Sequence, residues 1–141
     1  MINFIKKWLI SLGSPPVFFR WASKLLPWLF PISFLILFAG LIWGIGFAPT
    51  DYKQGDVYRI IFIHVPSAIL GQSVYLMMAF FGFICLIWKA KLAGMFLRSA
   101  APIGASFTLI ALVSGAVWGK PTWGTWWVWD ARLTSTLILF F

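Results

Sequence analysis

The sequence predicts an all-α membrane protein, a polytopic helix bundle with three complete transmembrane helices, the start of a fourth and an N-terminal interfacial helix. Two observations carry this fold class. Hydrophobic residues make up 62% of the chain and charged residues only 10%, which is far too apolar for a soluble domain. The apolar residues also form long runs without Asp, Glu, Lys or Arg, and about 20 such residues cross a bilayer. We therefore expect residues 1–141 to form a single membrane domain.

Residues 1–24 form the predicted interfacial segment. One helical face of this segment carries apolar residues, namely Ile5, Trp8, Leu9 and Leu12. This pattern is typical of a helix that lies on the membrane surface, and Gly-Ser-Pro-Pro at residues 13–16 interrupts it. The first long apolar run starts only near Leu25 and is too long for the core of a signal peptide, so we expect it to stay in the protein.

Three apolar runs are long enough to cross the bilayer, at residues 25–50, 60–88 and 99–119. The third run is rich in small residues that let helices approach closely, namely Gly104, Ala105, Ser106, Ser114, Gly115 and Ala116. Residues 133–141 begin a fourth run, but as a helix they rise only about 14 Å. This last run is too short to span a membrane.

The charged residues predict the orientation. Seven bases without an acid lie in the N-terminal segment and in the loop after the second run, namely Lys6, Lys7, Arg20, Lys24, Lys89, Lys91 and Arg98. The other two loops mix acids and bases, namely Asp51, Lys53, Asp56, Arg59, Lys120, Asp130 and Arg132. Because positive residues gather on the cytoplasmic side, we expect a cytoplasmic N-terminus and an external loop at residues 120–132.

The one histidine of the sequence, His64, lies near the outer end of the second run, about one turn after Ile60. An ionisable group at membrane depth is a candidate functional residue, and neutral imidazole is a common ligand of iron, zinc and copper. The alternative is a structural histidine, bonded to a backbone carbonyl that Pro66 leaves free. With one buried Cys85 and no second histidine, a metal on His64 needs most of its ligands from elsewhere, as in a porphyrin.

The external loop holds a dense group of tryptophans, namely Trp123, Trp126, Trp127 and Trp129. A tryptophan at a membrane interface is usually an anchor, and one or two suffice for that purpose. Four of them beside Gly119, Pro121 and Gly124 also fit a preformed apolar shelf for a flat ligand. The spacing alone leaves both interpretations open.

Three charged residues flank this loop. Asp130 fits the N-cap of the fourth helix, and Lys120 and Arg132 fit interfacial bases whose stems lie along apolar surface. The functional alternative is that one or both bases pair with the carboxylates of an anionic ligand, such as the propionates of haem.

Other classes of function are weakly supported. The sequence has no paired carboxylates, no Ser-His-Asp set and no phosphate loop, so we expect no enzyme. A solute transporter needs ionisable groups in mid-membrane, and a nucleic-acid partner is disfavoured because anionic lipid of the bilayer explains the bases. The main rival is a structural or scaffold subunit of a membrane transport complex whose tryptophan loop is only an interfacial anchor.

The stretch "WGTWWVWDARLTS" resembles the W-G-x-x-W-x-W-D signature of the haem-handling membrane proteins of cytochrome c maturation. Its fixed positions are occupied by Trp123, Gly124, Trp127, Trp129 and Asp130. Larger relatives follow the Asp with a Pro and an acidic residue, whereas Ala131 and Arg132 are more similar to the C component, haem exporter protein C. The stretches "GFAPTDYKQGDVYRIIFIHVPSA" and "APIGA" extend the resemblance to nearly the whole chain after about Trp28.

The resemblance implies a six-span protein of the bacterial inner membrane that holds haem b at its outer face and presents it to a membrane-anchored haem chaperone. A small single-span protein and the subunits of an ABC transporter are the other implied partners. His64 matches the first of two histidines that ligate the haem iron, and Trp123, Gly124, Trp126, Trp127, Trp129, Asp130 and Arg132 match the external haem-binding loop. The second histidine lies later in the family, so we expect this sequence to be an N-terminal portion.

Overall fold

The computed structural model describes residues 14–141, so the predicted surface helix over the first twelve residues lies outside the described part of the chain. The described elements are α2 (Pro15–Leu41), the π-helix η1 (Ile42–Phe47), the 3-10 helix η2 (Asp56–Ile60), α3 (Ile61–Trp88), α4 (Lys91–Trp123) and α5 (Ala131–Phe140). Residues 14–141 hold no strand, and the segments Pro15–Phe47, Asp56–Trp88 and Lys91–Trp123 are long and apolar enough to cross a membrane. The predicted fold class, an all-α bundle of membrane helices, is confirmed.

The helix boundaries differ from the predicted spans because hydrogen bonding continues past the apolar runs. Helix α2 begins at Pro15 rather than near Leu25, with extended Ser14 before it. Proline suits the first helical positions, where its missing N–H has no intrahelical partner. Ser14 and the two prolines after it therefore start a continuous helix. Helix α4 likewise includes Lys120 to Trp123, which we had expected to belong to the external loop.

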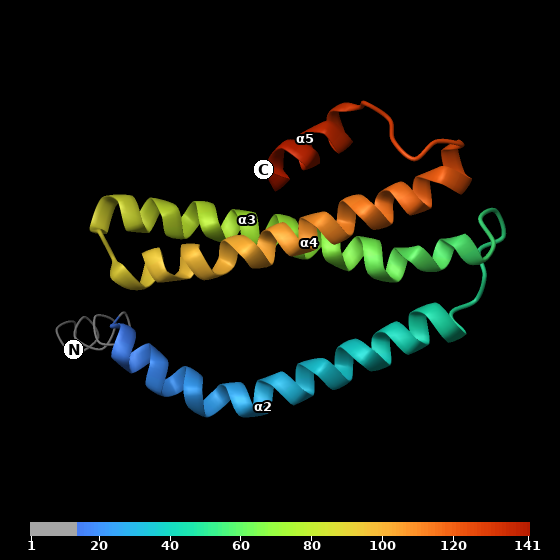
Figure 1. Cartoon of the computed structure of the whole chain (residues 1–141). Helices are drawn as coiled ribbons and strands as arrows, with labels where there is room; N and C mark the ends of the chain where they lie inside the picture. The colour runs from blue at the N-terminus through green and yellow to red at the C-terminus, as the bar shows by residue number, and fades with distance from the viewer. Residues whose placement is uncertain (1–13) are drawn as a thin grey trace, which may run out of the picture.

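Helices α3 and α4 form an antiparallel hairpin, with a tight turn at Lys89, whose φ of 50° is left-handed (Figure 1). Small residues make their contact close. A Cβ on Gly104 would lie 2.9 Å from Cγ1 of Val74, and one on Gly71 would lie 3.0 Å from Oγ1 of Thr108. The prediction that small residues of the third run allow close helix packing is confirmed at Gly104.

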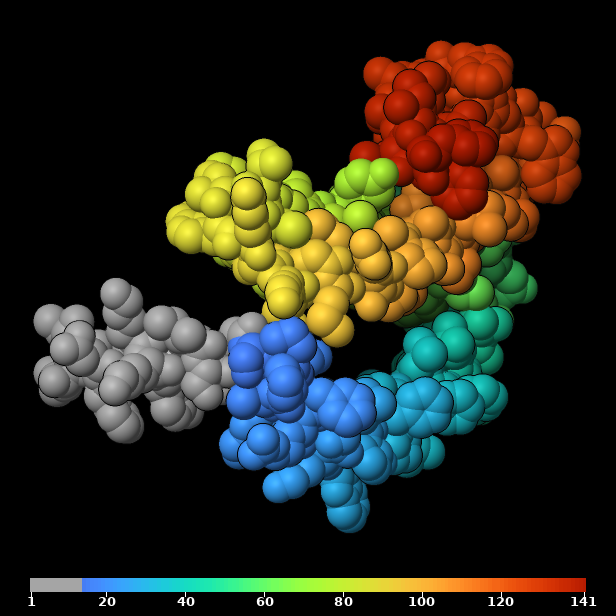
Figure 2. Space-filling view, turned by 60° about the vertical axis from the view of Figure 1, so that its left-hand side comes forward, coloured from blue at the N-terminus to red at the C-terminus, as the bar shows by residue number. Residues whose placement is uncertain are grey.

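Helix α2 lies beside this hairpin rather than inside a core. It curves around Pro27 and Pro31, and none of the residues Pro15–Leu41 is buried. Figures 1 and 2 show α2, in blue to cyan, extending along the molecule, and the C-terminal end of α2 leads into the hairpin. Exposed side chains such as Phe30 and Leu35 would be unfavourable in water, whereas lipid tails solvate them.

The connection between η1 and η2 is held by local hydrogen bonds. The Asp51 carboxylate accepts from the backbone N–H groups of Lys53 at 2.9 Å and Gln54 at 2.8 Å. Arg59 donates to the carbonyl of Ala48 at 3.2 Å and so fastens the start of the same loop. These bonds place the Gln54 side chain at the end of the hairpin where α3 begins.

Helix α5 turns back over the hairpin at that end, as the red ribbon of Figure 1 shows. The carboxylate of Asp130 accepts from the backbone N–H of Leu133 at 2.7 Å, which confirms Asp130 as the N-cap of this helix. At its far end, the Tyr75 hydroxyl of α3 donates to the carbonyl of Leu139. Helix α5 therefore contacts both α3 and α4 and covers one side of the space between them.

Candidate functional site

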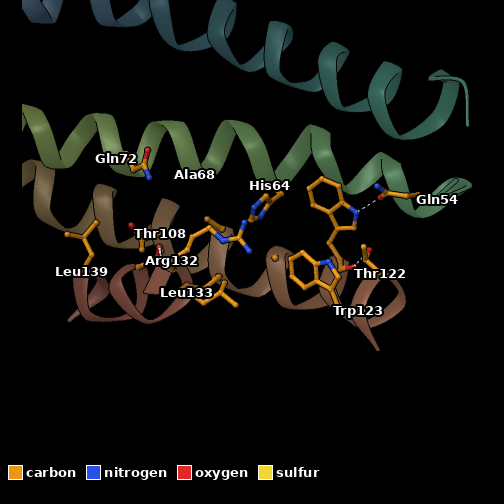
Figure 3. A pocket seen from close by; sticks show the side chains of 15 residues that line it. Gln54, His64, Ala68, Gln72, Thr108, Thr122, Trp123, Arg132, Leu133 and Leu139 are labelled. Atoms are coloured by element: carbon orange, nitrogen blue, oxygen red, sulfur yellow. Dashed lines mark hydrogen bonds between the residues drawn. The ribbon is translucent and has the colours of Figure 1, made fainter. Parts of the chain in front are cut away.

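A cavity of about 470 Å³ lies between α3, α4 and α5, close to the end of the hairpin where α3 begins and α4 ends (Figure 3). Its walls combine aliphatic residues with three threonines and with larger polar and aromatic side chains, namely Gln54, His64, Gln72, Trp118, Trp123 and Arg132. Sites for small molecules and cofactors typically measure about 300–1,000 Å³ and combine apolar walls with a few polar groups. The cavity therefore has the size and the character of a ligand site.

His64 is half-buried in the first turn of α3 and faces α4. Its Nδ1 lies 3.1 Å from Oγ of Ser114, and its ring meets the ring of Trp118 edge-on at 5.6 Å and 71°. The Ser114 hydroxyl and the backbone of Ala111, both on α4, lie against the imidazole, so its partners come from α4 rather than from a carbonyl left free by Pro66. With Nδ1 engaged, Nε2 is the ring nitrogen that remains for a ligand.

Trp118 forms a wall of the cavity that the sequence analysis missed. Its indole N–H donates to Oε1 of Gln54 at 2.7 Å, so the loop after η1 holds the ring in place (Figure 3). Trp118 lies inside the third apolar run, so in the sequence it has the character of a residue of a membrane span. The available signal was its spacing: Ser114 and Trp118 are four residues apart and share a helical face near His64.

Trp123 and Arg132 reach the same cavity from the end of α4 and the start of α5. The Arg132 guanidinium carbon lies 5.7 Å from the centre of the Trp123 ring, within the range of a cation–π contact. In Figure 3 the Arg132 side chain extends across the cavity toward His64. Its ion pair with Asp130, at 3.4 Å, is largely exposed and contributes about 0–1 kcal/mol, so the guanidinium can exchange partners easily.

The other residues of the predicted shelf lie outside this cavity. Trp126 and Trp129 are 57% and 76% exposed, and Gly124 ends α4 with a left-handed φ of 80°. Trp127 is half-buried and packs edge-on against Trp129 at 5.6 Å. Its Nε1 is buried without a hydrogen-bond partner among the described residues, which is costly for an indole N–H. The structure thus brings Trp123 to His64, whereas a continuous shelf of four rings is not seen.

The cavity suits a planar molecule that carries both a metal and acidic groups. No group of three or more His, Cys, Asp and Glu side chains among residues 14–141 could hold a metal ion. A metal at His64 must therefore bring other ligands with it, as a porphyrin does. The indoles of Trp118 and Trp123 offer apolar surface to such a ring, and Arg132 offers bidentate bonds to a carboxylate. The side chains present fit haem by their chemistry.

The fold and this cavity define an α-helical polytopic membrane protein with a ligand site at one end of a helical hairpin. Residues 8–141 match the family described as Heme exporter protein C. The chain belongs to the Heme exporter protein C family.

Curated relatives agree with this assignment. The chain is 53% identical over 135 residues to Heme exporter protein C of Escherichia coli strain K12, covering 96% of this chain and 55% of the relative. It is 48% identical over 135 residues to the protein of that name from Haemophilus influenzae, again covering 96% and 55%. For Paracoccus denitrificans the identity is 46% over 128 residues, covering 91% of this chain and 53% of the relative. The chain spans about half the length of these curated relatives.

Proposed function

We propose that this chain binds haem at the outer face of the bacterial inner membrane and presents it to a membrane-anchored haem chaperone during cytochrome c biogenesis. The observation that carries the proposal is the convergence of an imidazole, two indoles and a guanidinium on one cavity, from His64, Trp118, Trp123 and Arg132. Membership of the Heme exporter protein C family supports haem as the ligand. Catalysis by the chain itself forms no part of the proposal.

Each cavity residue has a distinct role in this proposal. Nε2 of His64 would ligate the iron of haem b, and the porphyrin would bring most of the other ligands of the metal. Trp118 and Trp123 flank the macrocycle and exclude water from it. Arg132 would pair with a propionate in place of its weak, exposed ion pair with Asp130.

The exposed part of the loop serves the transfer of haem. Trp126 and Trp129 present large apolar surfaces at the same end of the hairpin as the cavity. Such surfaces suit a transient contact with the haem chaperone. The small single-span protein and the ABC transporter subunits complete the proposed assembly in the lipid bilayer.

The second candidate function is a structural or scaffold subunit whose tryptophans only anchor the loop. The exposure of Trp126 and Trp129 favours this role for that part of the loop, because indoles commonly settle at the membrane interface. It does not account for the cavity around His64. The two candidates therefore differ in whether the cavity binds haem.

The first experiment tests the iron ligand. We expect His64→Ala to shift the Soret band of the haem-loaded protein and to lower haem retention at least about 10-fold, because the protein loses its axial nitrogen. Added imidazole should restore part of both signals, since it can occupy the vacated space.

Gln72→Ala is the matched control, because Gln72 lines the same cavity from the same helix without an imidazole. Its haem spectrum should resemble that of the wild type. An unchanged spectrum and unchanged retention in His64→Ala would remove the axial-ligand assignment and favour the scaffold role.

A further inference from the structure

The Ser114 hydroxyl makes three contacts, and the shortest of them fixes the direction of its bond to His64. One is a long contact of 3.3 Å with the carbonyl oxygen of Ala111, which can only accept. Oγ of Ser114 lies 2.6 Å from the carbonyl oxygen of Ile110, one turn earlier in α4, and 3.1 Å from Nδ1 of His64. A carbonyl oxygen only accepts hydrogen bonds, and a serine hydroxyl has one proton to donate. At 2.6 Å the two oxygens need that proton between them, because two bare acceptors so close repel each other.

In its contact with His64, the Ser114 hydroxyl must therefore accept a hydrogen bond rather than donate one. Ser114 Oγ keeps its lone pairs, so Nδ1 of His64 supplies the proton and donates to it. We propose that Ser114 is a positioning residue that holds the His64 imidazole in its Nδ1–H tautomer and leaves the lone pair of Nε2 for a ligand in the cavity. The identification of that ligand as the iron of haem rests on the proposed function.

The backbone of α4 adds a steric constraint to this hydrogen bond. A Cβ on Gly115 would lie 2.9 Å from Cε1 and 3.4 Å from Nδ1 of His64, so the ring occupies space that only glycine leaves free. The imidazole also packs against the ring of Trp118 in an edge-to-face arrangement. Ser114, Gly115 and Trp118 together form an imidazole seat on α4, which selects both the orientation and the tautomer of the ring.

Such a seat has a consequence for metal binding. A ligating histidine generally donates its second ring N–H to a fixed acceptor, which sets the tautomer and raises the basicity of the ligating nitrogen. Loss of that acceptor typically costs about 10–100-fold in metal affinity. Ser114 can perform this function through a neutral hydroxyl, so no carboxylate has to be buried in the membrane.

The test measures the tautomer in the absence of haem. We would label the protein with ¹⁵N-histidine, purify it haem-free in detergent and identify the His64 signals by their loss in His64→Gln. Nitrogen NMR shifts distinguish a protonated from an unprotonated ring nitrogen. The expected wild-type result is a proton on Nδ1, and Ser114→Ala should move it wholly or partly to Nε2.

Two further variants separate positioning from general damage to the helix. Ser114→Thr keeps the hydroxyl and should restore the wild-type tautomer. Ser106→Ala is the matched control, because Ser106 makes the same bond to the carbonyl one turn earlier, to Pro102 at 2.7 Å, but lies on another part of α4. Haem retention should fall about 10–100-fold in Ser114→Ala and stay near wild type in the other two variants.

The outcomes distinguish this inference from the proposed function. A proton on Nε2 in the wild type, or a tautomer unchanged by Ser114→Ala, overturns the inference. An equal loss of haem in Ser106→Ala overturns it as well, because the effect would then belong to the helix. A different outcome is a tautomer that shifts as expected while both His64→Gln and Ser114→Ala retain haem. That result would confirm Ser114 as the positioning residue of His64 and contradict the proposed function.

Discussion

At the scale of single residues, the site depends on a few polar groups in a very apolar chain. His64 is the one histidine among 141 residues, and Arg132 makes an exposed ion pair with Asp130 and a cation–π contact with Trp123. Each of these side chains alone is a common feature of membrane proteins. They gain a shared function because the α3–α4 hairpin and α5 bring them to one cavity with two indoles. The tryptophans can accordingly be divided by whether they line that cavity.

This division predicts different effects for two tryptophans of the same loop motif. Trp123→Ala should lower haem retention several-fold, because it removes a flat apolar wall, and added imidazole should not restore it. Trp129→Ala should leave retention near wild type, since that ring is largely exposed outside the cavity. Retention is measured by haem absorbance after gel filtration.

A matched control for both is Trp88→Ala, which removes an exposed indole at the other end of α3. If Trp129→Ala lost as much haem as Trp123→Ala, the whole loop would have to contact the ligand, as a shelf of four rings requires.

Three residues that line the cavity can be singled out from the sequence more easily than the residues that support them. His64, Trp123 and Arg132 stand out from the sequence because each is rare or grouped at the end of an apolar run. The supporting residues were missed, since Ser114 and Trp118 belong to an apolar stretch and Gln54 to a polar loop. Their importance depends on distances across the α3–α4 interface, and no local pattern in one helix specifies those.

At the scale of the elements, α4 carries most of the site. Its face toward α3 changes character along the helix: Gly104 allows close packing in the middle, and the imidazole seat follows nearer the end. Beyond the seat, α4 ends at Gly124, whose N–H bonds to the carbonyl of Lys120 at 3.0 Å. The chain then crosses to α5, so the N-terminus of α5 determines where Arg132 lies.

The N-cap of α5, Asp130, therefore leads to a prediction about the stability of the first turn of α5 and about haem retention. Asp130→Ala removes the acceptor for Leu133 N–H and should destabilise the first turn of α5 by about 0.5–2 kcal/mol. Hydrogen exchange of that turn should quicken accordingly. Asp130→Asn can still cap the helix but cannot pair as an ion with Arg132.

The two variants separate the roles of Asp130. We expect Asp130→Asn to retain slow exchange and near-normal haem retention, because the exposed ion pair contributes little. Loss of haem in Asp130→Asn with unchanged exchange would instead show that the carboxylate charge itself acts on the ligand or on Arg132.

At the scale of the whole molecule, the two ends of the α3–α4 hairpin differ in the charged residues that they carry. Described bases without nearby acids, such as Lys89, Lys91 and Arg98, lie at the turn between α3 and α4. The three acids of the sequence, Asp51, Asp56 and Asp130, lie in the connections at the other end, beside the cavity. Figure 1 places these two ends at opposite sides of the hairpin. The sequence could predict this polarity because the apolar runs alternate with loops of different charge.

The orientation across the membrane remains a prediction, and accessibility labelling can test it. Because bases gather on the cytoplasmic side, single cysteines at Thr125 and Lys91 should lie on opposite faces, in a Cys85→Ser background that removes the native thiol. Both positions are exposed and lie at opposite ends of α4. A membrane-impermeant maleimide added to intact cells with a permeable outer membrane should label Thr125→Cys and spare Lys91→Cys. Lysis should then expose Lys91→Cys to the reagent, which shows that this thiol is reactive. The reverse pattern would place the His64 cavity on the cytoplasmic side and exclude delivery of haem to an external chaperone from this site.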